Sequence, residues 1–196
     1  MIRLQSDVDY VNLSLADVSA ALGDVARQSE PTFAGLDGRQ LNWRPDATRW
    51  SVAQCLEHLL TANRLMIQAA EDALTGATPR TIWQRLPVWP GVAGKMLIRS
   101  QAPGTTRKFS AAPAAQPAAS DITDDIVPRF LRQHREAAAW VQRMDQDRAA
   151  GRIMTSPFVR VVTYSVLDGC RLIVAHDHRH LQQARHVTRA SGFPTG

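Results

Sequence analysis

Four stretches of the chain repeat apolar residues at alternating intervals of three and four, and this spacing constrains the fold more than any other feature. Residues at these intervals lie on one face of an α-helix, so each stretch predicts a helix that buries one apolar stripe. The expected helices cover about 7–28, 51–76 and 164–189, with a third helix that begins between 120 and 128 and ends at 151. A chain of 196 residues is most simply one domain. The sequence therefore predicts an all-α protein, a four-helix bundle in a single domain spanning residues 1–196.

The segment between the second and third expected helices, residues 79–120, is rich in residues that break helices. Its prolines and glycines are Pro79, Pro87, Pro90, Gly91, Gly94, Pro103, Gly104, Pro113 and Pro117. They leave room for one short helix at 92–99. A connection this long fits a crossover that returns the chain to the end where helix two began, so that helices two and three run parallel. Residues 111–119 are low in complexity and are expected to form a linker.

Two other connections are expected to lack regular paired structure. Residues 30–49 hold four helix breakers, which predict a loop: Pro31, Gly35, Gly38 and Pro45. Residues 153–162 are β-branched and apolar around Pro157, which indicates an extended connector and not a strand with partners.

The composition excludes several classes of protein. With 44% apolar and 21% charged residues, the chain has the balance of an ordinary folded protein. It has no apolar run long enough to span a membrane, and Asp7 and Asp9 stand where a signal peptide would have its apolar core. We therefore expect a cytoplasmic protein with no membrane partner. The two cysteines, Cys55 and Cys170, argue against a disulfide framework or a cysteine-based zinc module.

The net charge of +5 raises the question of nucleic-acid binding. The arginines are scattered along the chain and form no dense run or aromatic-interleaved platform. A solvated basic surface that favours anionic small molecules is the better interpretation, and nucleic acid is not an expected partner.

His176 and His180 lie one turn apart on the last expected helix, so both can point at a common atom. His178 lies about 200° round the helix from His176 and cannot join them. Two imidazoles at this spacing make half of a site for a divalent metal. The same spacing also suits a polar face or a hydrogen-bonded core pair, so the function depends on a third ligand from elsewhere in the chain.

Helix two offers a third histidine. Ser51 and Gln54 form a capping-box pattern at its start, and Gly76 marks its end. His58 then falls in the second turn, where the simplest interpretation of it alone is a partly buried, hydrogen-bonded side chain. His134 occupies an apolar-stripe position of helix three and is expected to be a hydrogen-bonded interior histidine.

Two groups of residues resemble the motifs of a known family. The first group opens helix two: Leu41, Asn42, Trp43, Arg44 and Pro45, then Trp50, Ser51 and Val52, then His58 and Leu59. The second leads to helix four: Ser156 and Pro157, then His176, Asp177, His178, Arg179, His180, Leu181, Gln182 and Gln183. A third, weaker match covers residues 104–113. On these motifs the chain resembles the DinB-like family of bacterial four-helix-bundle proteins, also called YfiT-like metal-dependent hydrolases.

The resemblance implies a metal site made by His58, His176 and His180, which would hold a divalent ion such as nickel, zinc, iron or manganese. Three protein ligands leave positions open for water or a thiol. Family members include thiol transferases, so the resemblance implies a metal-dependent thiol S-transferase or hydrolase-like enzyme, a small-molecule thiol or electrophile as its partner, and a homodimer as its assembly. The catalytic and substrate-binding residues stay unassigned.

Two alternative functions remain open from the sequence: a non-catalytic metal-binding or stress-response module, and a structural helical domain. A closed site would need a fourth ligand, for which Cys55 and His134 are the candidates. Asp177 diverges from His176 by about 100°, so it is expected at the surface or behind the ligands. Three arginines could bind an anionic thiol, although solvation is their simpler role: Arg160, Arg179 and Arg185.

Overall fold

The computed structural model describes residues 8–77, 79, 81–85, 88–105, 111–119 and 121–195. Four long helices dominate it: α1 (Leu15–Phe33), α3 (Val52–Thr75), α5 (Ile126–Gln142) and α7 (Val166–Thr188). The shorter elements are α2 (Gly38–Asn42), η1 (Trp83–Arg85), α4 (Trp89–Gln101), η2 (Pro113–Ala115), α6 (Gln146–Gly151), β1 (Ile153–Thr155) and β2 (Thr163–Ser165). The all-α prediction is therefore confirmed.

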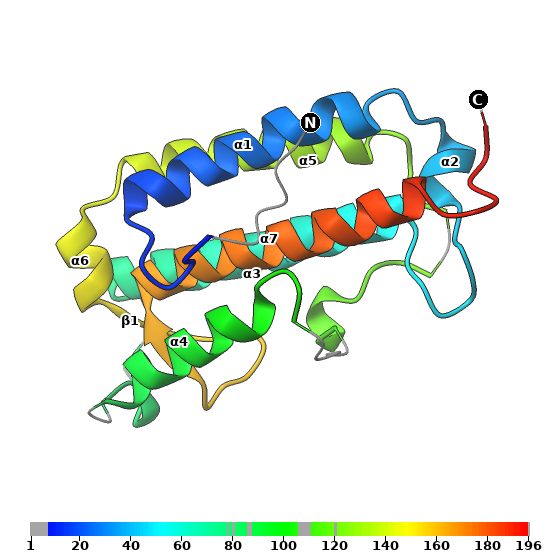
Figure 1. Cartoon of the computed structure of the whole chain (residues 1–196). Coiled ribbons are helices and arrows are strands. Elements are labelled where there is room, and N and C mark those ends of the chain that lie inside the picture. The colour runs from blue at the N-terminus through cyan, green and yellow to red at the C-terminus, as the bar shows by residue number, and fades with distance from the viewer. Residues whose placement is uncertain are drawn as a thin grey trace.

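The four long helices pack in a ring, with α1 against α5, α5 against α3, α3 against α7 and α7 against α1. Figure 1 shows α1 and α5 on one side and α3 and α7 side by side beneath them. The N-terminal halves of α3 and α5 share one core cluster and their C-terminal halves share another, so these two helices run parallel, as a crossover requires. The C-terminal half of α7 packs with the N-terminal half of α3, which makes that pair antiparallel.

A layer of buried polar side chains separates the two apolar clusters. On α7 the first cluster ends at Ala175 and the second begins at Leu181, and residues 176–180 lie between them. Asn63 of α3 and His134 of α5 occupy the same level, and both are buried. The core is therefore divided at the height of the histidine-rich stretch of α7.

Helix α1 begins and ends later than the apolar spacing predicts. Ser14 caps it by accepting a hydrogen bond from the Asp17 amide, and the Asp17 carboxylate accepts one from the Ser14 amide. The expected start at about residue 7 is wrong for residues 8–14, and Asp7 lies outside the described residues. The helix also continues through Pro31, because the fully buried Phe33 anchors its last turn and offsets the hydrogen bond that proline cannot make.

The segment expected to be a loop at 30–49 therefore holds the end of α1 and the short helix α2. Asp37 caps α2 in a capping box with Gln40. By contrast, both boundaries of helix two are confirmed, since Ser51 and Gln54 form the expected capping box of α3 and Gly76 ends it in the left-handed conformation.

The long connection contributes more structure than its sequence indicates. Helix α4 is longer than the expected 92–99 and packs on α7. Gly94 permits this close contact, because a Cβ atom there would lie 2.6 Å from Oδ2 of Asp168. The expected linker at 111–119 includes η2, in which Ala115 is buried.

Residues 153–162 were expected to have no strand partner, and this prediction is wrong. Strand β1 pairs with β2 in an antiparallel hairpin in which Met154 faces Tyr164. Both side chains are fully buried, so the apolar core that they share stabilises the pairing. Helix α7 follows directly, with Ser165 as its cap.

Among the described residues, no helix combines the length and the apolar character needed to cross a membrane.

Candidate metal centre

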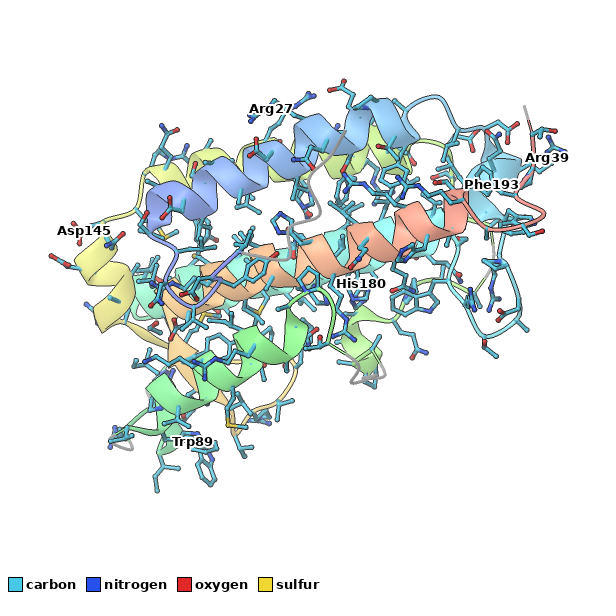
Figure 2. All side chains as sticks on the ribbon, viewed as in Figure 1. Arg27, Arg39, Trp89, Asp145, His180 and Phe193 are labelled. Atoms are coloured by element: carbon cyan, nitrogen blue, oxygen red, sulfur yellow. The ribbon has the colours of Figure 1, made fainter. Side chains whose placement is uncertain are left out.

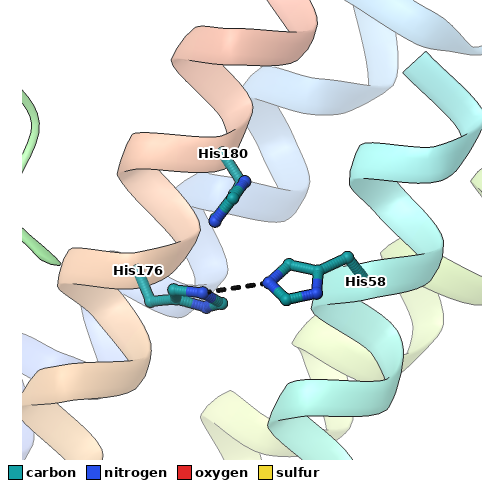
Figure 3. Close-up of side chains that lie close together, drawn as sticks. All are labelled: His58, His176 and His180. Atoms are coloured by element: carbon teal, nitrogen blue, oxygen red, sulfur yellow. Dashed lines mark hydrogen bonds between the residues drawn. The ribbon is translucent and has the colours of Figure 1, made fainter. Parts of the chain in front are cut away.

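The structure brings His58, His176 and His180 together. Because α3 and α7 are antiparallel neighbours, the second turn of α3 lies beside the middle of α7, and His58 projects toward the two histidines of α7 (Figure 3). One ring nitrogen from each of the three side chains lies within 4.8 Å of the other two, and the group could hold a metal ion. His58 is buried, while His176 and His180 are half-buried and approach the surface.

The spacing of the imidazole nitrogens fits a common ion. Nε2 of His58 lies 3.1 Å from Nε2 of His176. Two nitrogens that are each about 2.1 Å from one ion lie roughly 3.0–3.4 Å apart at octahedral to tetrahedral angles. The three rings also approach one another closely, with centroid separations of 5.0, 4.7 and 4.5 Å.

Hydrogen bonds behind two of the rings fix which nitrogen carries the proton. Nδ1 of His58 donates to the carbonyl oxygen of Ala115 at 2.6 Å, because a carbonyl oxygen can only accept. Nδ1 of His180 donates to Oε1 of Gln183 at 3.1 Å for the same reason. In the neutral ring the proton then sits on Nδ1, and Nε2 presents a lone pair, which is the form that binds a metal.

Burial keeps these rings uncharged near neutral pH. It lowers the pKa of His180 to about 3, with His58 and Arg179 acting in the same direction. Burial also places the pKa of His176 well below its usual value, helped by the charges of His180 and His58. The pKa of His58 is lowered by burial, and its bond to Ala115 partly opposes this shift. The site therefore presents neutral imidazoles, as cation binding requires.

Trp50 covers the cluster from the start of α3. Its ring is stacked on His180 with a centroid separation of 5.7 Å, and it lies 4.9 Å from His58 at a tilted angle. The indole thus restricts both imidazoles from one side.

The other candidate ligands lie apart from this group. Among the described residues, the cluster of metal-binding type contains three histidines and neither Cys55 nor His134. Cys55 is fully buried, and burial raises the pKa of its thiol to about 12. His134 is the hydrogen-bonded interior histidine that was expected: its Nδ1 donates to the carbonyl of Phe130 at 2.9 Å.

Asp177 and His178 face away from the cluster. Asp177 is fully buried, not at the surface, and its carboxylate contacts Nε2 of His134 at 3.0 Å and Nδ2 of Asn63 at 2.9 Å. His178 points toward the segment that precedes α1, and its Nδ1 lies 2.8 Å from the hydroxyl of Tyr10. This placement confirms the prediction from helical geometry that His178 does not join His176 and His180.

The arginines proposed for an anionic thiol are spread out. Arg179 donates to the carbonyl of Ser100 and the hydroxyl of Thr105, and so joins α7 to the end of α4. Arg185 donates to Oε1 of Gln28 on α1, and Arg160 is exposed in the loop between the two strands.

The sequence indicated no role in the site for three contributors, Trp50, Ala115 and Gln183, although Trp50 and Gln183 belong to the two stronger motifs. Gln183 could have been found, because it stands three residues after His180 on the same helix face. Nothing in the low-complexity segment around Ala115 signals that its carbonyl meets His58, since a backbone acceptor leaves no mark on the sequence.

Comparison with known proteins identifies a family for the chain. No curated protein and no solved structure gives a significant match to the chain. A family model described as the DinB superfamily matches residues 21–184, which include the three histidines, α3 and most of α7. Residues 106–110 of the weaker motif at 104–113 lie outside the described residues. The first of the two stronger motifs runs from α2 to the start of α3, and the second begins just after β1 and continues along α7. The chain belongs to the DinB superfamily.

Proposed function

We propose that this protein holds a divalent metal ion on His58, His176 and His180 and uses it as an enzyme on small molecules, most simply as a thiol S-transferase. The observation that carries the proposal is the convergence of three neutral imidazoles, two of them with Nδ1 bound to a fixed acceptor. Imidazole nitrogen suits nickel, zinc and iron, and manganese is included because the resemblance to the family allows it.

Three protein ligands leave room for an exchangeable one. A bound divalent ion lowers the pKa of a thiol or a water molecule that reaches it, which produces a nucleophile at neutral pH. The chain's own residues hold the ion, orient the rings through Ala115 and Gln183, and cover one side with Trp50. In the transfer, the thiol proton passes to solvent, the sulfur forms a bond to the electrophilic carbon, and the leaving group departs with the electron pair of the broken bond.

The first test measures metal content. Wild-type protein and His176→Ala are loaded with nickel, zinc, iron or manganese, freed of excess metal and analysed for bound ion. His186→Ala is the matched control, because His186 is an exposed histidine on the same helix. We expect roughly one ion per chain in wild type and in His186→Ala, and a large loss in His176→Ala. Equal metal content in all three proteins would refute the proposed three-histidine site.

The second test separates an enzyme from a metal-binding module. Metal-loaded protein is incubated with cellular thiols and a panel of electrophiles, and loss of free thiol and formation of the conjugate are followed together. Metal-dependent conjugation that His176→Ala abolishes would support the transferase. If the protein binds metal but accelerates conjugation for no pair of thiol and electrophile, the non-catalytic metal-binding module is favoured.

A further inference from the structure

The exposed apolar side chains of the described residues gather in one region. Every large apolar residue that is exposed there comes from two segments, 82–96 and 159–161. We call this region the α4 patch, and it consists of Ile82, Trp83, Val88, Trp89, Val92, Met96, Val159 and Val161. Val88 and Ile82 are 77% and 72% exposed, which is far more than packing residues of a core show. Figure 2 shows Trp89 at the outer end of α4, well away from His180.

The α4 patch is held together by hydrogen bonds between its segments. Nε1 of Trp89 donates to the carbonyl of Val161 at 3.2 Å, which ties α4 to the loop of the hairpin. Thr163 donates to the carbonyl of Trp83 at 3.2 Å, which ties the hairpin to η1. Within α4, Trp89, Val92 and Met96 follow the spacing of one helix face, opposite the buried Gly94 and Ile98. The patch is therefore preformed.

The stretches of chain that include the patch segments and extend beyond them are basic in sequence. Residues 73–120 and 148–167 contain nine of the 23 lysines and arginines and none of the 18 acidic residues. Because the whole chain has a charge of +5, the remainder carries −4. Arg85, Lys95, Arg99 and Arg160 are exposed on the same elements as the apolar side chains. An apolar surface edged by cations complements an anionic surface.

The tryptophan geometry suits a lipid interface. An indole that enters an apolar phase must keep its N–H paired, and the N–H of Trp89 is already satisfied by Val161. Tryptophans beside lysines and arginines are typical of surfaces that lie in the headgroup region of a bilayer, where the long basic side chains reach the phosphates. A second copy of the chain fits less well, because it would bring two basic faces together.

The sequence, which has no membrane-spanning run, predicts no membrane partner, but we infer that the α4 patch docks the protein peripherally on an anionic lipid bilayer. The apolar side chains enter the headgroup and upper acyl region, and the basic side chains around them contact the lipid phosphates. None of the patch residues belongs to the histidine cluster, so this docking does not depend on a bound metal.

The test is co-sedimentation of the full chain with vesicles of phosphatidylcholine alone or with about 30% phosphatidylglycerol, at low and high salt. We expect at least about tenfold stronger binding to the anionic vesicles, and weaker binding as salt rises. Val92→Glu/Met96→Glu and Lys95→Glu/Arg99→Glu should each lower binding by about tenfold or more. These positions are exposed, so the helical circular dichroism should be unchanged.

A matched control reverses the same number of charges at positions outside the α4 patch. Arg27→Glu/Arg129→Glu places the same reversal on α1 and α5, and vesicle binding should stay within about twofold of wild type. As a measurement that needs no variant, brominated lipid in the anionic vesicles should quench tryptophan fluorescence. The inference is overturned if the wild type does not bind vesicles, or if the wild type and Val92→Glu/Met96→Glu bind them equally. It is also overturned if the wild type self-associates and Val92→Glu/Met96→Glu abolishes this association, because the patch would then be a contact between copies of the chain.

Discussion

The Nδ1 atom of His58 donates a hydrogen bond to the carbonyl oxygen of Ala115 at 2.6 Å, across 57 residues of sequence. This bond joins the long connection to the proposed metal centre and selects the tautomer that leaves Nε2 free. The connection is thus part of the site as well as the route between α3 and α5.

Loosening this contact should weaken metal binding. Ala115 is buried, so Ala115→Leu must displace η2 and with it the carbonyl that orients His58. Partners behind a metal ligand are typically worth about 10–100-fold in affinity, and we expect a loss of that size by competition with a chromophoric chelator. Ala114→Leu, at the exposed neighbouring position, should bind metal as wild type does. Equal losses in the two variants would contradict a specific role for the Ala115 carbonyl.

The buried polar layer should be a major determinant of stability. The carboxylate of Asp177 contacts both His134 and Asn63, and all three side chains are buried, on three different helices. His134→Ala removes one of the two partners of this buried carboxylate and leaves a cavity, so the free energy of unfolding in urea should fall by about 2–4 kcal/mol. Arg135→Ala breaks only the exposed ion pair with Glu30 and should cost less than about 1 kcal/mol. Similar losses of unfolding free energy in both variants would refute a special contribution of the buried polar layer to stability.

The start of α1 can be tested through the sign of a stability change. At its capping position, Ser14 accepts a hydrogen bond from the Asp17 amide, so Ser14→Ala should lower the free energy of unfolding by about 1 kcal/mol. Ser14→Asn should retain most of the cap. If the helix began near residue 7, Ser14 would be inside it and alanine would stabilise the protein instead, by about 0.5 kcal/mol. Urea titrations at fixed pH distinguish the two signs.

Acid should destabilise the metal-free protein in part through the site histidines. Burial lowers the pKa of His180 to about 3 and that of His176 well below the ordinary value of 6.5. The unfolded chain therefore binds more protons than the folded chain between those values, and stability falls as pH falls from 6.5 toward 3. The free energy of unfolding of His180→Gln should change less over this interval than that of wild type. A steeper change in the variant would mean that His180 is charged in the folded state.

Helical periodicity and capping are local properties, and the sequence predicted them well where both signals agreed. At α3, Ser51, Gln54 and Gly76 mark the boundaries that the structure has. At α1 the apolar spacing alone predicted too early a start: Val8 and Val11 continue it, but in the structure the capping box at Ser14 begins the helix. Val11 is buried through packing of the chain before the helix, so its spacing resembles a helix without being part of one.

Contacts between distant segments were decided by the tertiary structure. Residues 153–155 acquire a strand partner only because the chain returns at 163–165 and the core covers both. Asp177 is buried because α3 and α5 offer it Asn63 and His134, although its helix position alone is compatible with the surface. The gathering of Trp89 and Val161 on one patch likewise follows from the docking of α4 beside the hairpin.

The sequence by itself determined that His176 and His180 share one helix face and that His178 does not, because an α-helix fixes those directions over a single turn. The antiparallel packing of α3 on α7 then brought His58 to them, and the crossover brought the Ala115 carbonyl behind His58. These last two relationships depend on side-chain packing and a backbone atom far away in the chain, and local spacing cannot encode either of them.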